Sequence, residues 1–218
     1  DPYMDKRRMY CPRGRVLGGS SSINGMAYLR GNALDYEQWA DDFELPNWRY
    51  RNVLPYFQKA EDFDQGENAY HSTGGPLHVT TGKMHNPLYH AFVEAGMVAG
   101  YPYTPDMNGY QQEGLGPMFM TTKDGVRWST ANAYLRPAMK RSNLDVATRT
   151  HTRRIIFDGK RAVGVELERR GQTFRADAEQ EVLLCAGAIN SPQLLMLSGV
   201  GPVEQLEPHN IQTVQSMP

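Results

Sequence analysis

Apolar residues recur at helical spacing in three segments of the first half of the chain. They do so over 33–40, 51–60 and 88–99, with polar residues at the intervening positions. A Pro-Asn pair separates the first two segments and favours a turn there. The pattern predicts three helices, with Trp39 and Trp48 packing the first two together.

Strict alternation of apolar and polar residues appears after a Gly-Gly-Pro sequence at 74–76. It covers 77–81 and predicts a strand. No period holds for long over 100–116, where glycine, asparagine, glutamine and tyrosine accumulate. We predict loops there, which are either a binding rim or ordinary surface loops.

Strand patterns dominate from residue 143 onward. Residues 144–148 alternate, and 154–157 and 162–168 flank Asp158-Gly159, a pair typical of a hairpin turn. Residues 181–186 form a short continuous apolar run, as a buried parallel strand does. The second half of the chain is therefore predicted to contain four strands.

The apolar run passes through small residues into a helix that begins at Ser191 and Pro192, because proline in a first turn needs no amide partner. A strand followed by a small-residue turn and a helix is the geometry of ligand contact at the carboxyl end of a sheet. Together the patterns predict a mixed α/β architecture.

Composition narrows the class of protein. The 218 residues are 40% hydrophobic and 22% charged, with a formal net charge of −1 at pH 7. This length allows one sizeable core or parts of two, and the charge gives no footprint for nucleic acid or anionic lipid. The basic cluster at 6–8 is interpreted as a solvated surface. No apolar run approaches the roughly 20 residues of a membrane helix, and no cleavable signal pattern opens the chain.

The cysteines and histidines do not form a metal-binding pattern. Cys11 and Cys185 lie far apart and are predicted to be free thiols, Cys185 inside the apolar strand, which favours a reducing compartment. The six histidines lack the spacing of a metal site, so no metal is expected. None of them carries the motif of a catalytic base, and His71 and His78 are interpreted as structural.

The glycine pair Gly18-Gly19 opens an apparent helix within the segment 14–31, which leads into Asn24. Two adjacent glycines let the backbone approach a flat or anionic ligand without a Cβ clash. The serines that follow cap a helix and leave amide donors free for that ligand. A glycine pair before a helix is also common as a tight turn. On this pattern alone, a ligand site and a plain turn both remain open.

Two long segments resemble the signatures of a known family. Segment 14–31 resembles the first signature of the glucose-methanol-choline (GMC) flavoprotein oxidoreductases, and 187–201 resembles their second, in the family's order. The resemblance extends through nearly the whole chain. It implies part of an FAD-binding Rossmann-like domain over 1–82, an inserted portion of the substrate-binding domain over 83–142, and a return of the FAD-binding domain over 143–218.

The resemblance also implies which residues contact the flavin. The matching positions are Gly18, Gly19, Ser20, Asn24, Gly25, Met26, Thr152, Ala186 and Gly187. In the family, the first three positions form a turn beside the flavin and the next three follow the isoalloxazine edge. The position of Thr152 meets the adenine, and the last two positions lie near the ribose and pyrophosphate. A purely backbone role without a ligand is the alternative for each residue.

Within the family, the segments 30–33, 106–114, 155–166 and 181–188 most resemble the choline-oxidising members. This likeness implies an FAD-dependent alcohol oxidoreductase that oxidises choline to betaine aldehyde by hydride transfer to flavin N5. Some of those members carry a histidine bonded covalently to the flavin where this chain has Ile23. Isoleucine has no nucleophile, so FAD is expected to be bound non-covalently. This favours a dehydrogenase over an oxidase without deciding between them, and the electron acceptor stays open.

Two parts of the family pattern find no match in the sequence. No apolar strand precedes a Gly-x-Gly-x-x-Gly turn, and no histidine matches the family's catalytic base. The chain is therefore expected to be an internal, inactive fragment whose catalytic histidine lies outside it. The family resemblance favours a bacterial cytoplasm, a mitochondrion or a membrane-associated site.

Other function classes remain open at this point. A GMC oxidoreductase of another primary alcohol is one alternative. A non-redox member of the hydroxynitrile lyase type, or a remnant that only binds a partner or nucleotide, is another.

Overall fold

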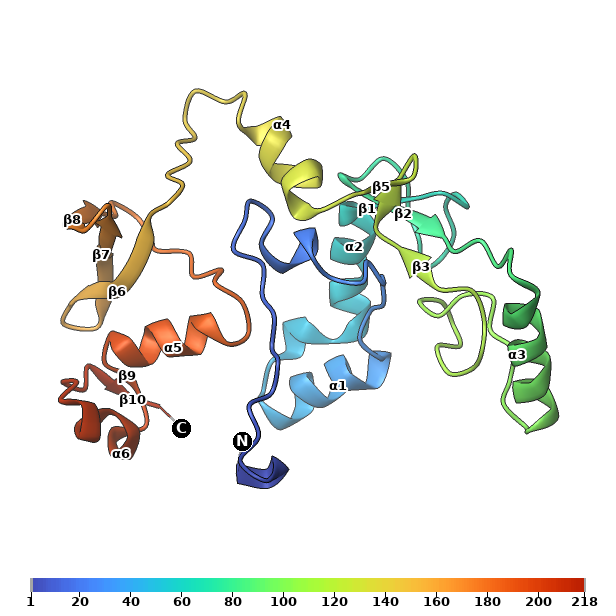
Figure 1. Ribbon diagram of the computed structural model, residues 1–218, viewed down its shortest axis with the longest axis horizontal. Helices are drawn as coiled ribbons and strands as arrows, with labels where there is room; N and C mark the ends of the chain where they lie inside the picture. Colours follow the sequence, from blue (N-terminus) through green and yellow to red (C-terminus); the bar gives the residue numbers. More distant parts are fainter. Residues whose placement is uncertain (1, 218) are drawn as a thin grey trace. The chain divides into compact units, whose positions relative to one another are not determined.

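The computed structural model describes residues 2–217 (Figure 1). The chain forms two compact units that divide between Leu144 and Asp145. Each unit is described by itself below. The assignment of 1–82, 83–142 and 143–218 to cofactor and substrate portions stays a prediction.

Two of the predicted helices lie next to each other in the first unit. Helix α1 covers Ala33–Asp42 and helix α2 covers Tyr50–Ala60, with a short 3₁₀ turn at Pro46–Trp48 between them. The α1 helix begins with a capping box, in which the Asn32 side chain accepts from the Leu34 amide at 2.9 Å and Asp35 accepts from the Asn32 amide at 3.0 Å.

The predicted tryptophan contact joins this pair. The rings of Trp39 and Trp48 meet edge to face with centroids 5.8 Å apart. Arg49, just before α2, adds an ion pair to Glu37 of α1 at 2.6 Å. The helical spacing of the apolar residues thus predicted both helices, and the predicted tryptophan contact joins α1 to the turn that leads into α2.

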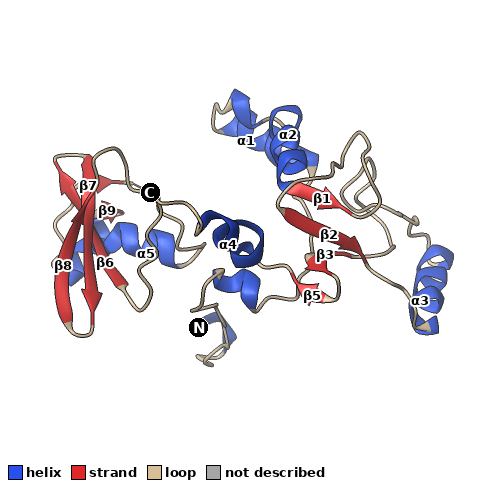
Figure 2. Cartoon of the chain, turned by 90° about the horizontal axis from the view of Figure 1, so that it is seen from above, coloured by secondary structure: helices blue, strands red, loops and turns tan. Residues whose placement is uncertain are grey.

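A small sheet lies at the centre of the first unit (Figure 2). Strand β1 (Glu61–Phe63) runs parallel to β2 (Leu77–Thr81), and β2 pairs antiparallel with β3 (Phe119–Met120). One residue from each strand, Phe63, Val79 and Phe119, forms the buried core, with Tyr28 packed against it. The strand predicted at 77–81 is confirmed.

The remaining elements of the first unit surround this sheet. They are the 3₁₀ turns Pro2–Met4 and Gly19–Ser22, helix α3 (Pro87–Val98), strands β4 (Thr122–Lys123) and β5 (Val126–Arg127), a π-helix at Ala131–Leu135 and helix α4 (Arg136–Ala138). Helix α3 confirms the third predicted helix. Residues 100–116 form loops, as predicted.

The second unit begins with a three-stranded antiparallel meander (Figures 1 and 2). Strand β6 (His151–Asp158) pairs with β7 (Arg161–Arg169), which pairs with β8 (Gln172–Asp177). The predicted hairpin is confirmed, although its turn is formed by Gly159 and Lys160, one residue later than expected, because Asp158 pairs with Arg161. Strand β8 was not predicted from the pattern.

Helix α5 (Asn190–Leu197) packs on β6, close to the predicted helix start. The Ser198 hydroxyl at its end accepts from the Ile155 amide at 2.8 Å, and Ile155, Leu194 and Leu206 are buried in this unit. The last elements are β9 (Val200–Gly201), α6 (Val203–Leu206), a 3₁₀ turn at Glu207–His209, and β10 (Gln215–Ser216), which pairs parallel with β9.

Two predicted strands are wrong. Residues 144–148 and 181–186 have no strand structure, and Leu183 in the second is 76% exposed. A strand needs a neighbour to satisfy its backbone groups, and neither segment pairs with one among the described residues. Cys185 is accordingly exposed and not inside a buried strand, although both cysteines are free thiols as predicted. The mixed fold class itself is confirmed by the helices and sheets of both units.

Candidate functional site

The glycine pair forms a sharp turn and not the start of a long helix. Gly18 and Gly19 both have positive φ, at 89° and 54°, and lead into a single 3₁₀ turn that ends at Ser22. The Ser20 hydroxyl accepts from the Gly14 amide at 3.2 Å, and the Ser20 carbonyl accepts from the amides of Ile23 and Asn24. The apparent helix of the sequence is therefore corrected to one short turn, since the Ser20 carbonyl closes it after four residues.

The glycines of this turn differ in what surrounds them. A Cβ on Gly18 would lie 2.6 Å from the Ser22 hydroxyl and 3.1 Å from the Ala131 methyl, so the chain's own packing requires glycine there. A Cβ on Gly19 or Gly25 would meet nothing within 4 Å. Gly19 still needs its positive φ, whereas Gly25 has no positive φ. Neither packing nor backbone conformation within the chain explains a glycine at position 25.

Gly25 sits in a turn that is open on one side. Asn24 and Gly25 are exposed, and no described residue accepts a hydrogen bond from the Gly25 amide. The Asn24 side chain accepts from the Met26 amide at 3.1 Å and holds Met26 at a positive φ of 63°. An exposed glycine with a free amide beside a fixed turn suits close approach of a flat ligand to the backbone.

The other three predicted contact residues lie in the second unit. Thr152 is half-buried in β6. The Ala186 amide donates to the Ser191 hydroxyl at 3.1 Å, and the Ser191 amide donates to the Gly187 carbonyl at 2.9 Å. Gly187 has a φ of 91° and open space where a Cβ would stand. The two bonds close a tight turn before α5, so the predicted turn is present although the strand before it is not.

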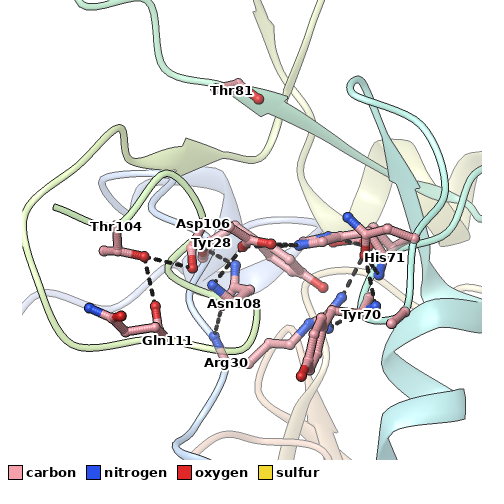
Figure 3. A network of polar contacts seen from close by, with 12 residues as sticks. Tyr28, Arg30, Tyr70, His71, Thr81, Thr104, Asp106, Asn108 and Gln111 are labelled. Carbon is pink, nitrogen blue, oxygen red and sulfur yellow. Dashed lines mark hydrogen bonds and ion pairs between the residues drawn. The ribbon is translucent and has the colours of Figure 1, made fainter.

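A buried ionic network, not predicted from the sequence, lies at the end of the first motif (Figure 3). The Arg30 guanidinium donates to Glu61 Oε2 at 3.0 Å and to the Tyr70 carbonyl at 2.7 Å. His71 places Nδ1 2.8 Å from the same Glu61 oxygen and Nε2 3.1 Å from both carboxylate oxygens of Asp106. Arg30, Glu61 and His71 are almost completely buried.

Asn108 links this network to the backbone of the motif. Its side-chain oxygen accepts from the Arg30 amide at 2.7 Å, its side-chain nitrogen donates to the Tyr28 carbonyl at 3.1 Å, and its own amide donates to Asp106 at 2.9 Å. The loop around 106–108 is thus attached to the chain just after the glycine turn, and to β1 through His71. Figure 3 shows Asp106 and Asn108 converging on Arg30 and His71.

Geometry fixes the charge of His71. Each ring nitrogen faces a carboxylate, and a neutral imidazole has only one N–H to donate. Burial alone would lower the pKa of His71, but the carboxylates of Asp106 and Glu61 raise it above its ordinary value. Burial likewise favours neutral Asp106, yet hydrogen bonds from His71 and the Asn108 amide hold its pKa below the usual range. The set therefore contains two cations, Arg30 and His71, and two anions, Glu61 and Asp106.

Only a weak signal for this network is present in the amino-acid sequence. His71 follows a glycine-containing loop and was interpreted as structural, which agrees with its position. Its partners lie 10 residues before it and 35 residues after it, a separation that no local motif encodes. The run 106–109, Asp-Met-Asn-Gly, was the only indication, because Asp and Asn in a loop often anchor its backbone.

Comparison with known proteins identifies the family. Residues 2–213 match the sequence model of the GMC oxidoreductases. The chain belongs to the GMC oxidoreductase family. It is 57% identical over its whole length to the oxygen-dependent choline dehydrogenase of Chromohalobacter salexigens, and 56% identical to that of Escherichia coli K12. It spans 39% and 40% of the length of those two proteins.

Solved structures agree with this family. The pyridoxine 4-oxidase of Mesorbium loti superposes with a TM-score of 0.88 at 36% identity, covering 94% of this chain and 41% of that one. An FAD-dependent oxidoreductase from Chaetomium thermophilum superposes with a TM-score of 0.86 at 27% identity, covering 94% and 38%. The GMC oxidoreductases are FAD-dependent flavoproteins, and FAD is the cofactor of this family.

Residues 2–217 contain neither a membrane-spanning helix nor a cluster of metal-binding side chains. No helix there is long and apolar enough to cross a membrane. No group of three or more histidine, cysteine, aspartate or glutamate side chains is arranged there to hold a metal ion.

Proposed function

We propose that the full-length protein is an FAD-dependent oxidoreductase that oxidises choline to betaine aldehyde. The observation that carries this proposal is the 57% identity, over every part of this chain, to a protein named oxygen-dependent choline dehydrogenase. Relatives of the same name in several bacteria share 55% or more. Identity at this level over the whole length of this chain supports the same cofactor and the same substrate class.

The part of the site that this chain supplies is a wall for the flavin. We propose that the contacts are made by the nine residues named from the signatures: Gly18, Gly19, Ser20, Asn24, Gly25, Met26, Thr152, Ala186 and Gly187. Gly25 supports this best, because its missing side chain and free amide have no use within the described chain. We further propose that 1–82 and 143–218 belong to the FAD-binding domain and 83–142 to the substrate-binding domain.

These residues hold and orient the cofactor but do not move the alcohol proton. FAD, when bound, supplies the acceptor for the hydride that leaves the alcohol carbon. The exposed backbone of Asn24 and Gly25 offers amide donors and a flat surface. His71, whose ring nitrogens both face carboxylates, has no free nitrogen to act as a base. We therefore propose that the general base comes from outside these 218 residues.

Two further observations concern how FAD is attached and which cellular compartment the protein occupies. Ile23 is 49% exposed beside the proposed flavin wall and has no nucleophilic atom, so we propose non-covalent FAD. The two free, exposed cysteines favour a reducing compartment. The electron acceptor of the relatives is oxygen by name, and the acceptor here is an outcome of the assay below.

Oxidation of another primary alcohol is the second candidate. The observation that favours it is the 36% identity to a pyridoxine 4-oxidase, whose name indicates a different alcohol on the same framework. Choline, a quaternary ammonium, is recognised by aromatic faces and carboxylates, whereas pyridoxine is an aromatic alcohol with no net charge at neutral pH. The two substrates therefore demand different pockets.

The experiment is turnover by the purified full-length protein. Its absorbance spectrum reports bound flavin, and flavin reduction by choline, pyridoxine and simple primary alcohols is followed without oxygen before oxygen or a dye is added. We expect bound FAD, rapid reduction by choline, and slow reduction by the others. Preferential reduction by another alcohol selects the second candidate, and protein with no flavin and no response to added FAD contradicts both.

A further inference from the structure

One arginine from a distant part of the chain contacts the proposed flavin-facing turn. A single nitrogen of Arg127, Nη1, donates to the Ser21 carbonyl at 3.1 Å, the Asn24 carbonyl at 2.7 Å and the Asn24 side-chain oxygen at 2.8 Å. Arg127 lies 103 residues after Asn24 in the sequence. Three oxygens of one turn thus converge on one cationic nitrogen, an arrangement stronger than contacts between neutral groups.

The arginine itself is held firmly. It ends β5, where it pairs with Thr122 of β4. The next residue, Trp128, donates its amide to the Thr121 carbonyl at 2.8 Å and its indole N–H to the Pro76 carbonyl at 2.8 Å. The Arg127 carbonyl accepts from the Asn132 side chain at 2.9 Å. The guanidinium therefore extends from a fixed backbone, and its hydrogen bonds to Ser21 and Asn24 support the turn.

The contact reaches the exposed side of the turn through Asn24. The same Asn24 side-chain oxygen that accepts from Arg127 also accepts from the Met26 amide, and Met26 holds the positive φ of 63°. A non-glycine residue keeps such a conformation only when its surroundings impose it. Arg127 is half-buried, while Asn24 and Gly25 are exposed. The direction of the Gly25 amide thus depends on a chain of contacts that begins at Arg127.

We propose that Arg127 is a positioning residue for the flavin: it fixes the segment 24–26 in the orientation that presents the Gly25 amide and open backbone to the isoalloxazine. The inference rests on the proposed function of this turn. Arg127 touches no reacting atom and acts only through Asn24. Its loss should loosen the turn without removing any group that contacts the cofactor.

Substitutions that change the number and position of the donors show whether Arg127 acts through its hydrogen bonds or only through its bulk. One guanidinium nitrogen carries two N–H groups and serves three oxygens, so one of the bonds is shared. A lysine ammonium carries three N–H donors and the same charge but is one bond shorter. Methionine has similar bulk and no donor. Arg127→Lys should therefore restore part of what Arg127→Met removes.

The test uses the full-length protein with Arg127→Met, Arg127→Lys and the control Arg136→Met. Arg136 is exposed, and its side chain makes no hydrogen bond or ion pair among the described residues. Three quantities are measured: hydrogen exchange of the peptide covering 18–29 in the apoprotein, the dissociation constant of FAD, and the rate of flavin reduction by choline per bound flavin. Arg127→Met should accelerate exchange in 18–29 on the order of 10-fold. It should slow flavin reduction on the order of 10- to 100-fold, the scale of a small misplacement.

The outcomes distinguish this inference from the proposed function. If Arg127→Met keeps the wild-type hydrogen exchange, FAD affinity and rate of flavin reduction, Arg127 is not a positioning residue, and the proposed function is unaffected. Failure of the unchanged protein to bind FAD overturns the proposed function first. If Arg127→Met does not fold, Arg127→Lys decides, because wild-type values in all three measurements would show that the position of the donor is unimportant. An equal loss in Arg136→Met also counts against the inference.

Discussion

At the scale of single residues, Gly25 is the best probe of the proposed cofactor wall. A methyl at this position meets nothing within 4 Å and the backbone has no positive φ, so the chain alone tolerates it. We predict that Gly25→Ala changes the stability of the apoprotein by no more than about 0.5 kcal/mol. A flavin lying against this backbone would be displaced by the methyl, at about 1–3 kcal/mol for overpacking.

Thermal melts of the full-length protein with and without FAD measure both effects. Gly14→Ala is the contrasting variant, since its methyl would collide with the Gly19 carbonyl and should destabilise the apoprotein itself. If Gly25→Ala binds FAD as tightly as the unchanged protein, the flavin does not approach this residue.

Ile23 supports a second prediction at this scale. A histidine-linked flavin stays with the polypeptide after denaturation, whereas a flavin held only by contacts is released. We predict that acid precipitation of the full-length holoprotein leaves all the FAD in the supernatant. Flavin fluorescence that migrates with the denatured chain on a gel would mean that a residue other than Ile23 forms the link.

At the scale of elements, the network around His71 ties the 106–108 loop to β1 and the end of the first motif. The pKa of His71 is raised in the folded protein, so its contribution to stability is complete below the unfolded value of about 6.5 and is lost as the pH rises through the raised value. The pKa of Asp106 is lowered, so its contribution is complete above about 3.9 and is lost as the pH falls through the lowered value. The network therefore holds the 106–108 loop most strongly at pH values where Asp106 is ionised and His71 is protonated.

We predict that the free energy of unfolding falls on the alkaline side as His71 loses its proton. His71→Gln should remove this part of the pH dependence and cost about 3–5 kcal/mol near pH 6, because it removes the cation that faces Asp106 and one of the two that face Glu61. Denaturant unfolding at several pH values measures both effects. His78→Gln is the matched control, since the half-buried His78 side chain faces one carboxylate, that of Asp62 at 2.7 Å, where His71 faces two. An alkaline slope that survives in His71→Gln would assign it to another group.

The elements that the sequence predicted correctly are those that local pattern determines. Helices α1, α2 and α3 each carry their own apolar spacing, and α1 and α3 also begin with an asparagine cap. The β6–β7 hairpin carries its own partner strand and turn. The segments 144–148 and 181–186 have strand-like patterns, but a strand forms only beside a neighbour. Strand β8 was missed although Arg170-Gly171 ahead of it is a two-residue turn signal.

The candidate site shows the same distinction between features that a local segment encodes and features that depend on distant residues. The glycine pair and the serines of one contiguous segment, 18–26, marked the turn that we propose to face the flavin, although they indicated a helix where the structure has one short turn. The supports of that turn were not predictable, because Arg127 lies about a hundred residues away and no spacing rule connects it to Asn24. The same holds for Asp106 and His71. A contiguous motif can therefore be recognised in the sequence, whereas the distant side chains that hold it in place become visible only in the fold.

At the scale of the whole molecule, many large apolar side chains among the described residues are exposed, and few are buried. Helix α3 has no buried residue, and Leu88, Phe92 and Val98 on it are 72%, 67% and 90% exposed. Leu183, in the segment 181–186, is 76% exposed. Apolar surface of this extent on a free protein favours association with other apolar groups.

We therefore predict that the 218 residues, produced by themselves, bind a hydrophobic fluorescent dye strongly, whereas the full-length protein binds it weakly. The same isolated chain should retain no FAD and should not be reduced by choline, because its flavin-facing turn has no glycine-rich pyrophosphate turn beside it in the sequence. Dye fluorescence and flavin absorbance of the two proteins, purified in parallel at equal concentration, measure these differences. An isolated chain that is monomeric, silent toward the dye and yellow with stoichiometric FAD would show that these 218 residues complete their own core and cofactor site.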